Sequence, residues 1–139
     1  MNIHDDIKNV LLVDDDTNIT FLMKVALREL TDWKIEIAAS GIEALQTAES
    51  TRPDLILLDV MMPIMDGCMT YIKFRENSRF DSTLIIFVTA KAQASELDEF
   101  RKLGVDGVII KPFDPVSLVD EIELRIAQAE AKREANVRS

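Results

Sequence analysis

Four short, uninterrupted apolar runs along the chain are the feature that most restricts the folds it can adopt. They lie at residues 10–13, 55–58, 84–88 and 108–110, and a fifth run at 35–38 alternates apolar with polar residues. A continuous apolar run without alternation is typical of a strand that is covered on both faces, as in a parallel sheet. The alternating run at 35–38 indicates an edge strand.

Segments with helical periodicity lie between these strands. Apolar residues recur at helical spacing over residues 19–30, so that they form one stripe along a predicted helix. Ser40 and Glu43 form a capping box at the start of the next helix. Near the C-terminus, Asp114 followed by Pro115 is typical of an N-cap and a first helical residue. The second helix is predicted from residue 40 through residue 48 and is stopped by Pro53. Further helices are predicted over residues 67–76, 94–103 and 114–126.

The alternation of strand and helix predicts an α/β fold, with a doubly wound, five-stranded parallel sheet and helices on both faces. The length of 139 residues fits one domain with a single core. We expect residues 1–127 to form this domain and the polar residues 128–139 to form a C-terminal helical extension or a linker.

Composition excludes several classes of function. A net charge of -9, from 25 acidic and 16 basic residues, argues against direct nucleic-acid binding and against an anionic membrane surface. No apolar run approaches the length of a membrane span. The single cysteine, Cys68, excludes an internal disulfide and suits the reducing cytoplasm, where we expect the protein to be located. The only histidine, His4, lies in a polar N-terminal segment and is expected to be chemically inert.

Polar residues at the ends of the predicted strands are the main functional feature of the sequence. Residues 14–16 are all aspartate and follow the first strand, and the later strand ends carry Asp59, Thr89 and Lys111. The carboxyl ends of parallel strands line the crevice in which open α/β sheets bind ligands. We therefore expect three carboxylates, a hydroxyl and an ammonium to meet there, whereas the third aspartate of the run is expected to cap the next helix.

Clustered carboxylates repel one another, and a divalent cation would relieve this repulsion. Mg²⁺ prefers oxygen ligands and is commonly held by one or two carboxylates together with phosphate oxygens. A carboxylate can also act as the nucleophile in phosphoryl transfer. Asp59 is therefore predicted to accept a phosphoryl group, whose oxygens would be bound by Mg²⁺, by Lys111 and by the hydroxyl of Thr89.

Four motifs together resemble the receiver domain of two-component response regulators, and of chemotaxis regulators in particular. They are VLLVDDD at 10–16, LILLDVMMPIMDG at 55–67, VTA at 88–90 and KPF at 111–113, and the resemblance covers roughly residues 8–127. It implies a flavodoxin-like sheet of strand order 2-1-3-4-5 and dependence on Mg²⁺. It also implies that the phosphoryl group comes from a histidine kinase or a histidine phosphotransfer protein.

Carried over residue by residue, the resemblance makes Asp14 and Asp15 the metal-binding pair, with the backbone carbonyl of Met61 as a further ligand. The acceptor, the switch hydroxyl and the phosphate-binding lysine would be Asp59, Thr89 and Lys111. The peptide bond between Lys111 and Pro112 is implied to be cis. The implied partners are the phosphodonor and a downstream protein or fused output domain, and the assembly is a monomer or a phosphorylation-dependent dimer.

Three positions depart from the family pattern. Val108 stands where many receivers carry an aromatic residue, three positions before the lysine, so it cannot switch by ring rotation. Met61 and Lys91, two residues after the acceptor and two after the switch threonine, border the path of a hydrolysing water and cannot accept its proton. We therefore predict slow self-dephosphorylation, and a rearrangement that involves the fourth helix and its loop.

Three alternatives remain open. The chain could be a receiver that belongs to a longer multidomain regulator or a hybrid kinase. An aspartyl-phosphate phosphatase would need a second acid two residues after Asp59, where Met61 stands. A flavodoxin-like electron carrier would need a hydroxyl-rich phosphate loop after the first strand, where three aspartates would instead repel a phosphate. The leading interpretation is a signalling module that turns over no separate substrate.

Overall fold

The computed structural model describes residues 6–138, so His4 lies outside the described part of the chain. Strands and helices alternate as predicted, and a short 3₁₀ helix, Ser78–Phe80, precedes the fourth strand. The strands are β1 (Asn9–Val13), β2 (Lys34–Ala38), β3 (Leu55–Leu58), β4 (Leu84–Thr89) and β5 (Gly107–Ile110). The helices are α1 (Thr17–Leu30), α2 (Gly41–Thr51), α3 (Gly67–Arg75), α4 (Ala94–Leu103) and α5 (Leu118–Arg138). None of these helices is long and apolar enough to cross a membrane.

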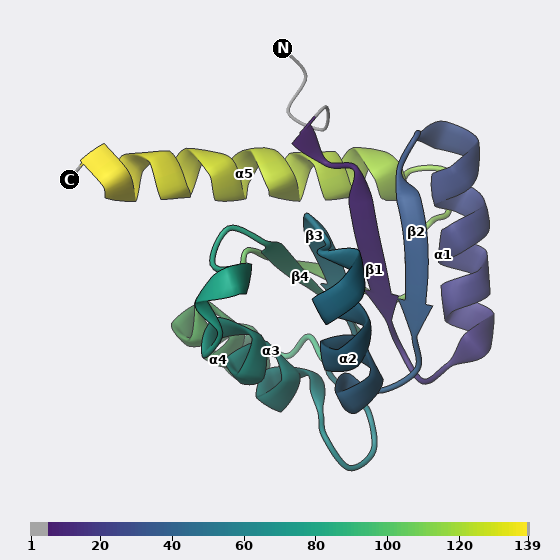
Figure 1. The fold of residues 1–139 in the computed structure, drawn as a ribbon, viewed down its shortest axis with the longest axis horizontal. Coiled ribbons are helices and arrows are strands. Elements are labelled where there is room, and N and C mark those ends of the chain that lie inside the picture. The colour runs from purple at the N-terminus through teal and green to yellow at the C-terminus, as the bar shows by residue number, and fades with distance from the viewer. Residues whose placement is uncertain (1–5, 139) are drawn as a thin grey trace.

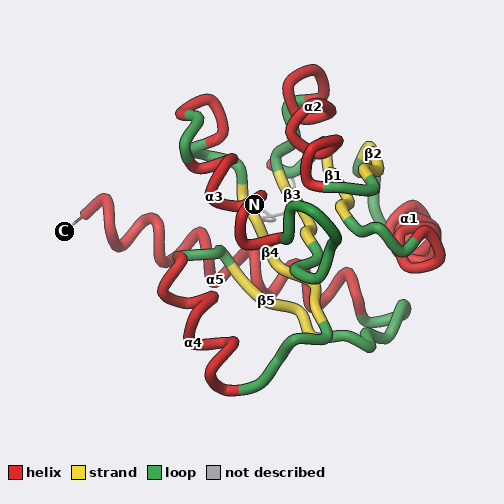
Figure 2. Tube along the Cα trace, turned by 90° about the horizontal axis from the view of Figure 1, so that it is seen from below, coloured by secondary structure: helices red, strands yellow, loops and turns green. Residues whose placement is uncertain are grey.

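The strands form one parallel sheet in the order β2-β1-β3-β4-β5. Strands β1 to β4 are labelled in Figure 1, and β5 can be seen in Figure 2. Val13 of β1 pairs with Leu58 of β3, which in turn pairs with Phe87 of β4. Because β1 and β3 are neighbours in register, the residues that follow them, Asp14 and Asp59, come together at one edge of the sheet. This order is the one that the family resemblance implies, and it places the alternating strand β2 at an edge as predicted.

Two apolar cores flank the sheet, one on each face. Helices α1 and α5 cover one face, and α2, α3 and α4 cover the other (Figure 2). Successive residues of a strand serve different cores, because Leu57 packs with α1 and α5 whereas Leu58 packs with the helices of the opposite face. All four residues of β3 are buried, which explains why this strand shows no polar alternation.

The start of α5 differs from the prediction. The sequence predicts a helix that begins at Asp114, but α5 begins at Leu118. The carboxylate of Asp114 accepts a hydrogen bond from the backbone N–H of Val116, and its carbonyl accepts one from the backbone N–H of Ser117. This local turn satisfies backbone groups that the start of a helix would leave unpaired, so the helix begins about one turn later.

The later turns of α5 are attached to the sheet by ion pairs that the sequence analysis missed. Asp106, in the loop between α4 and β5, accepts hydrogen bonds from Arg75 of α3, from Arg133 of α5 and from the backbone N–H of Ile85. Arg133 also donates to the backbone carbonyl of Thr83. The side chain of Asp106 is largely buried, and the two guanidinium groups balance its charge. Helix α5 therefore contacts the rest of the domain at least as far as Arg133.

Asp106→Asn is expected to lower the free energy of unfolding by about 2 to 3 kcal/mol, because it leaves two partly buried guanidinium groups without their counter-charge. Urea unfolding followed by circular dichroism measures this change. The control is Asp98→Asn, because Asp98 is an exposed residue that pairs with Arg101 and Lys102 of its own helix, and no measurable change is expected there. Equal stability of the two variants would contradict a structural role for Asp106.

Candidate functional site

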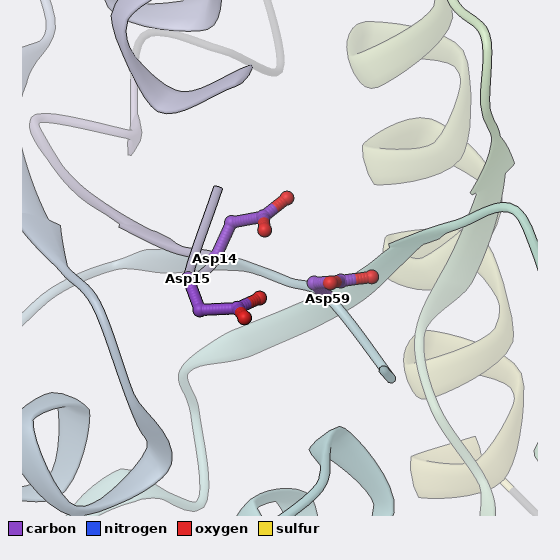
Figure 3. Close-up of side chains that lie close together, drawn as sticks. All are labelled: Asp14, Asp15 and Asp59. Atoms are coloured by element: carbon purple, nitrogen blue, oxygen red, sulfur yellow. The ribbon is translucent and has the colours of Figure 1, made fainter. Parts of the chain in front are cut away.

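Three carboxylates meet at the carboxyl edge of the sheet. Asp14 and Asp15 follow β1, Asp59 follows β3, and their carboxylate oxygens lie within 4.8 Å of one another (Figure 3). Hydrogen bonds that continue the sheet hold two of them, since the backbone N–H of Asp59 binds the carbonyl of Val13 and that of Asp14 binds the carbonyl of Ala38. Asp14 and Asp59 are buried, whereas Asp15 is exposed to solvent.

Lys111 brings a positive charge to this cluster. Its Nζ atom lies 2.7 Å from Oδ2 of Asp14 and 3.5 Å from Oδ1 of Asp59. Burial alone would lower the pKa of Lys111, but the hydrogen bond to Asp14 and the charge of Asp59 hold this pKa above its ordinary value of 10.5. The lysine is therefore charged at neutral pH. The peptide bond between Lys111 and Pro112 is cis, as the resemblance implies.

One ammonium does not balance the charge of three carboxylates, and this imbalance changes the pKa of Asp59. Burial and the charge of Asp14 raise the pKa of Asp59 to about 6, although Lys111 and the backbone N–H of Met61 oppose this rise. The ionised form of Asp59 therefore lacks part of the positive charge that would stabilise it. Three clustered carboxylates with unmet negative charge are the donor set that a hard divalent cation such as Mg²⁺ prefers.

Thr89 ends β4, next to β3, and is fully buried. Its Oγ1 atom accepts a hydrogen bond from the backbone N–H of Lys91 at 3.0 Å, so the hydroxyl can still donate its own proton. The ammonium of Lys91 lies 3.5 Å from Oε2 of Glu96, whose other carboxylate oxygen accepts the backbone N–H of Gln93 at the start of α4. Lys91 thus connects Thr89 to the first turn of α4, a link that the sequence analysis missed because no motif marks it.

The loop between β3 and α3 folds back tightly beside Asp59. The backbone N–H of Gly67 binds the carbonyl of Val60 at 2.8 Å, and a Cβ atom on Gly67 would lie only 2.3 Å from the carbonyl oxygen of Asp59. The close approach of two backbone segments therefore requires glycine at this position. Met61 lies on the same loop, with its side chain 60% exposed.

Val108 lies in β5, in register with Phe87 of β4, and packs half-buried against the core on the face of α2, α3 and α4. Phe87 makes edge-to-face contacts with Tyr71 of α3 and Phe100 of α4. The hydroxyl of Tyr71 donates to the carbonyl of Gly104 at the end of α4. The aromatic ring at this pair of strands therefore comes from β4 rather than β5, and two further rings hold it in place.

Asp15→Asn is expected to weaken Mg²⁺ binding about tenfold, since it removes one of the three carboxylates. Asp16→Asn is the matched control, because the carboxylate of Asp16 caps α1, as predicted, by accepting the backbone N–H groups of Asn18 and Ile19, and asparagine caps equally well. Isothermal titration calorimetry with MgCl₂ measures both affinities. An equal loss in the two variants would contradict a role of Asp15 as a ligand.

The same titration checks how the pKa of Asp59 affects Mg²⁺ binding. At low pH the folded protein holds a proton on Asp59 that a cation must displace, so the affinity is expected to rise as the pH increases through about 6 and then to level off. Without Mg²⁺, the contribution of Asp59 to the stability of the fold is expected to fall as the pH rises, which is opposite to the trend in Mg²⁺ affinity. Because the pKa in the folded state exceeds the ordinary value of 3.8, the contribution of Asp59 to stability is greatest at low pH and is lost as the pH rises through about 6.

Sequence comparisons agree with this arrangement. A family model described as the response regulator receiver domain matches residues 10–123. Response regulator Rre1 of Synechocystis sp. is 32% identical over 128 residues, which are 92% of this chain and 54% of Rre1. Chemotaxis protein CheY of Halobacterium salinarum is 37% identical over 83% of this chain and 93% of CheY. This chain thus spans about half the length of Rre1 but nearly the whole length of that CheY.

Solved structures show the same fold. Chemotaxis response regulator CheY4 of Vibrio cholerae superposes with a TM-score of 0.79 at 31% identity, over 86% of this chain and 98% of CheY4. A CheY-like receiver domain protein from Methanospirillum hungatei superposes with a TM-score of 0.77 at 29% identity, over 91% of this chain and 99% of that protein. With the family model, these matches show that the chain belongs to the response regulator receiver domain family of two-component systems.

Proposed function

We propose that this receiver domain accepts a phosphoryl group on Asp59 from the phosphohistidine of a histidine kinase or a histidine phosphotransfer protein, with Mg²⁺ bound beside it. The observation that carries this proposal is the position of Asp59, which lies in one cluster with Asp14 and Asp15 and 3.5 Å from Nζ of Lys111. Response regulators interact with kinases and output partners, and phosphorylation would act by changing such contacts.

Asp59 supplies the nucleophile. Without Mg²⁺ its carboxylate is ionised above a pH of about 6, and a bound Mg²⁺ would favour the ionised form further. One carboxylate oxygen attacks the phosphorus while the P–N bond to the donor imidazole breaks, and the electron pair of that bond leaves with the imidazole. The ammonium of Lys111, which lies 2.7 Å from Oδ2 of Asp14, would hold a phosphoryl oxygen. A bound Mg²⁺, held by Asp14, Asp15, Asp59 and the carbonyl of Met61, would neutralise charge on the phosphoryl oxygens.

Thr89 and the loop that leads to α4 supply the switch. A phosphoryl oxygen on Asp59 would accept a hydrogen bond from the Thr89 hydroxyl. A movement of Thr89 toward it would strain the hydrogen bond that Thr89 accepts from the backbone N–H of Lys91, whose ammonium is paired with Glu96 of α4. Because Val108 has no ring to rotate, we expect little change in β5. Structures with and without beryllofluoride test this expectation, and a large displacement of Val108 would contradict it.

Labelling with acetyl phosphate tests the proposed function. Incubation of the wild-type chain with acetyl phosphate and Mg²⁺ is expected to add one phosphoryl group, which peptide mapping by mass spectrometry should locate on Asp59. Removal of Mg²⁺ with EDTA is expected to stop the reaction. A folded chain that binds Mg²⁺ but takes up no phosphoryl group would overturn the proposal. Light scattering with beryllofluoride then distinguishes a monomer from a phosphorylation-dependent dimer.

The phosphoryl group on Asp59 is expected to be long-lived. By the family resemblance, Met61, an exposed thioether, and Lys91, an ammonium paired with Glu96, would border the path of an attacking water, and neither accepts a proton. The double variant Met61→Asn with Lys91→Glu is expected to lose its phosphoryl group on the order of tenfold faster. Decay of the phosphorylated band on a phosphate-affinity gel measures the rate, with Met69→Asn on exposed α3 surface as the control. An unchanged lifetime in the double variant would contradict this role.

A further inference from the structure

The loop between β3 and α3 presents an apolar side chain to solvent. Ile64 is 99% exposed, and it lies five residues after Asp59. The loop protrudes from the edge of the sheet at which β1 and β3 end, which is the edge of the acidic cluster (Figure 1). A side chain so exposed contributes no buried apolar area to the fold, so its contribution to stability does not explain its apolar character.

Ile64 also adopts a backbone conformation that is unfavourable for isoleucine. Its φ angle is +69°, and the backbone N–H of Met65 binds the carbonyl of Pro63 at 2.8 Å, which closes a tight turn around Ile64. A β-branched residue is strained at positive φ, whereas glycine adopts positive φ readily because it has no Cβ atom. Ile64 therefore combines backbone strain with full exposure, and strained residues cluster at functional sites.

Neighbouring contacts hold this turn in place. Pro63 has a restricted φ angle, and the hydrogen bond from the N–H of Gly67 to the carbonyl of Val60 closes the base of the loop. Met65 is half-buried and packs against the start of α2, where a Cβ atom on Gly41 would lie 3.0 Å from its sulfur. Ile64 is thus presented by an anchored turn, so that a partner would lose little ordering entropy by binding it.

The opposite face of the sheet also offers apolar surface beside the acidic cluster. A cavity of about 290 Å³ next to Lys111 is lined by Ile19, Leu22, Ala90, Pro112 and Phe113. The reactive carboxylate and ammonium are therefore flanked by apolar groups from both faces, although the chain has a net charge of -9. A macromolecule that reaches Asp59 would contact apolar surface around a charged centre. This surface is complementary to a protein whose reactive group is itself surrounded by apolar side chains.

We propose that Ile64 is a specificity-determining residue that inserts into an apolar pocket on the phosphohistidine-bearing donor protein. This inference rests on the proposed function, because a donor that brings a histidine ring to Asp59 must also cover the adjoining loop. A small donor such as acetyl phosphate reaches Asp59 without touching Ile64. Apolar anchors that fill a pocket carry a large share of the binding energy of an interface. Ile64 should therefore act on the KM for the protein donor and not on the chemistry at Asp59.

The test compares two phosphodonors on the wild-type chain and on four variants. The protein donor is the autophosphorylated histidine kinase that phosphorylates the wild-type chain fastest within a panel of purified kinases, and the small donor is acetyl phosphate. Ile64→Asn and Ile64→Ala are expected to raise the KM for the kinase about tenfold, or about 1.4 kcal/mol, with kcat unchanged. Ile64→Leu keeps an apolar side chain and is expected to keep KM within about threefold of wild type. Val137→Asn, at an 86% exposed position near the far end of α5, is the control and is expected to change neither reaction.

Thermal unfolding gives a second readout. Because asparagine is not β-branched and is less strained than isoleucine at a φ angle of +69°, Ile64→Asn is expected to keep Tm at or above the wild-type value while it weakens transfer from the kinase. A melting temperature no lower than that of the wild type would show that poor folding does not cause the weaker transfer.

The two donors separate the failure of this inference from the failure of the proposed function. An unchanged KM for the kinase in both Ile64→Asn and Ile64→Ala overturns the inference, and so does an equal loss of rate with both donors. A wild-type chain that is phosphorylated by acetyl phosphate but by no kinase of the panel also overturns it. A folded wild-type chain that takes up no phosphoryl group from either donor overturns the proposed function itself.

Discussion

Asp59→Asn is expected to abolish phosphoryl acceptance and, without Mg²⁺, to raise the melting temperature at a pH above about 6. The carboxylate is the proposed nucleophile, and an amide oxygen does not replace it. The gain in stability follows from electrostatics, because burial and the charge of Asp14 raise the pKa of Asp59 to about 6 and so disfavour the ionised side chain in the folded state. A neutral amide of similar shape removes this penalty, although it also weakens the interaction with Lys111.

Mass spectrometry after acetyl phosphate treatment and thermal unfolding across pH measure these two effects. At a pH below 3.8 the wild-type carboxyl is protonated in the folded and unfolded states, so the two melting temperatures should converge. Added Mg²⁺ should stabilise the wild type more than the variant. Asp120→Asn, in the first turn of α5, is the control for the loss of one exposed charge. Normal labelling of Asp59→Asn would show that the acceptor lies elsewhere, and a lower melting temperature at every pH would show that the contact with Lys111 outweighs the repulsion.

Gly67→Ala is expected to lower the free energy of unfolding by about 3 kcal/mol and to slow phosphoryl acceptance. The added Cβ atom would lie 2.3 Å from the carbonyl oxygen of Asp59 and 2.6 Å from Cα of Val60. Both are backbone atoms, which no side-chain rotation can move away. Relief of the clash must therefore displace the backbone of the acceptor itself, so that stability and reactivity should fall together.

Gly107→Ala is the matched control for this prediction. A Cβ atom on Gly107 would lie 3.1 Å from Cβ of Arg125, so α5 has to give by only a few tenths of an ångström, far less than the clash at Gly67 demands. The free energy of unfolding is expected to change by less than about 1 kcal/mol, with normal labelling by acetyl phosphate. Urea unfolding and labelling kinetics provide the comparison. A Gly67→Ala variant that matches Gly107→Ala in both would contradict the close approach of the loop to Asp59.

The strands and most helices can be predicted from local patterns, because the faces that an element buries determine which of its own residues are apolar. Strand β3 has no polar alternation since both of its faces are buried, and Asp16 marks the start of α1 since its side chain is complementary to the backbone there. The start of α5 was predicted wrongly for a reason that is also local. Asp114 followed by proline suits a helix cap and a turn equally well, and the hydrogen bond from the N–H of Val116 selects the turn.

Amino-acid sequence alone identifies which polar residues end the strands, and hence the carboxylates, the hydroxyl and the lysine of the candidate site, because a strand end is a local property. The strand order, which brings Asp14 beside Asp59, was implied by family resemblance and depends on how helices pack on two faces of the sheet. Contacts between distant residues required the folded chain: Lys111 binds Asp14 across 97 positions, Asp106 pairs with Arg133, and Gly67 touches the backbone of Asp59. Each of these contacts joins residues that are close in space but far apart along the chain, and their separation along the chain follows no period. A local sequence pattern therefore cannot predict them.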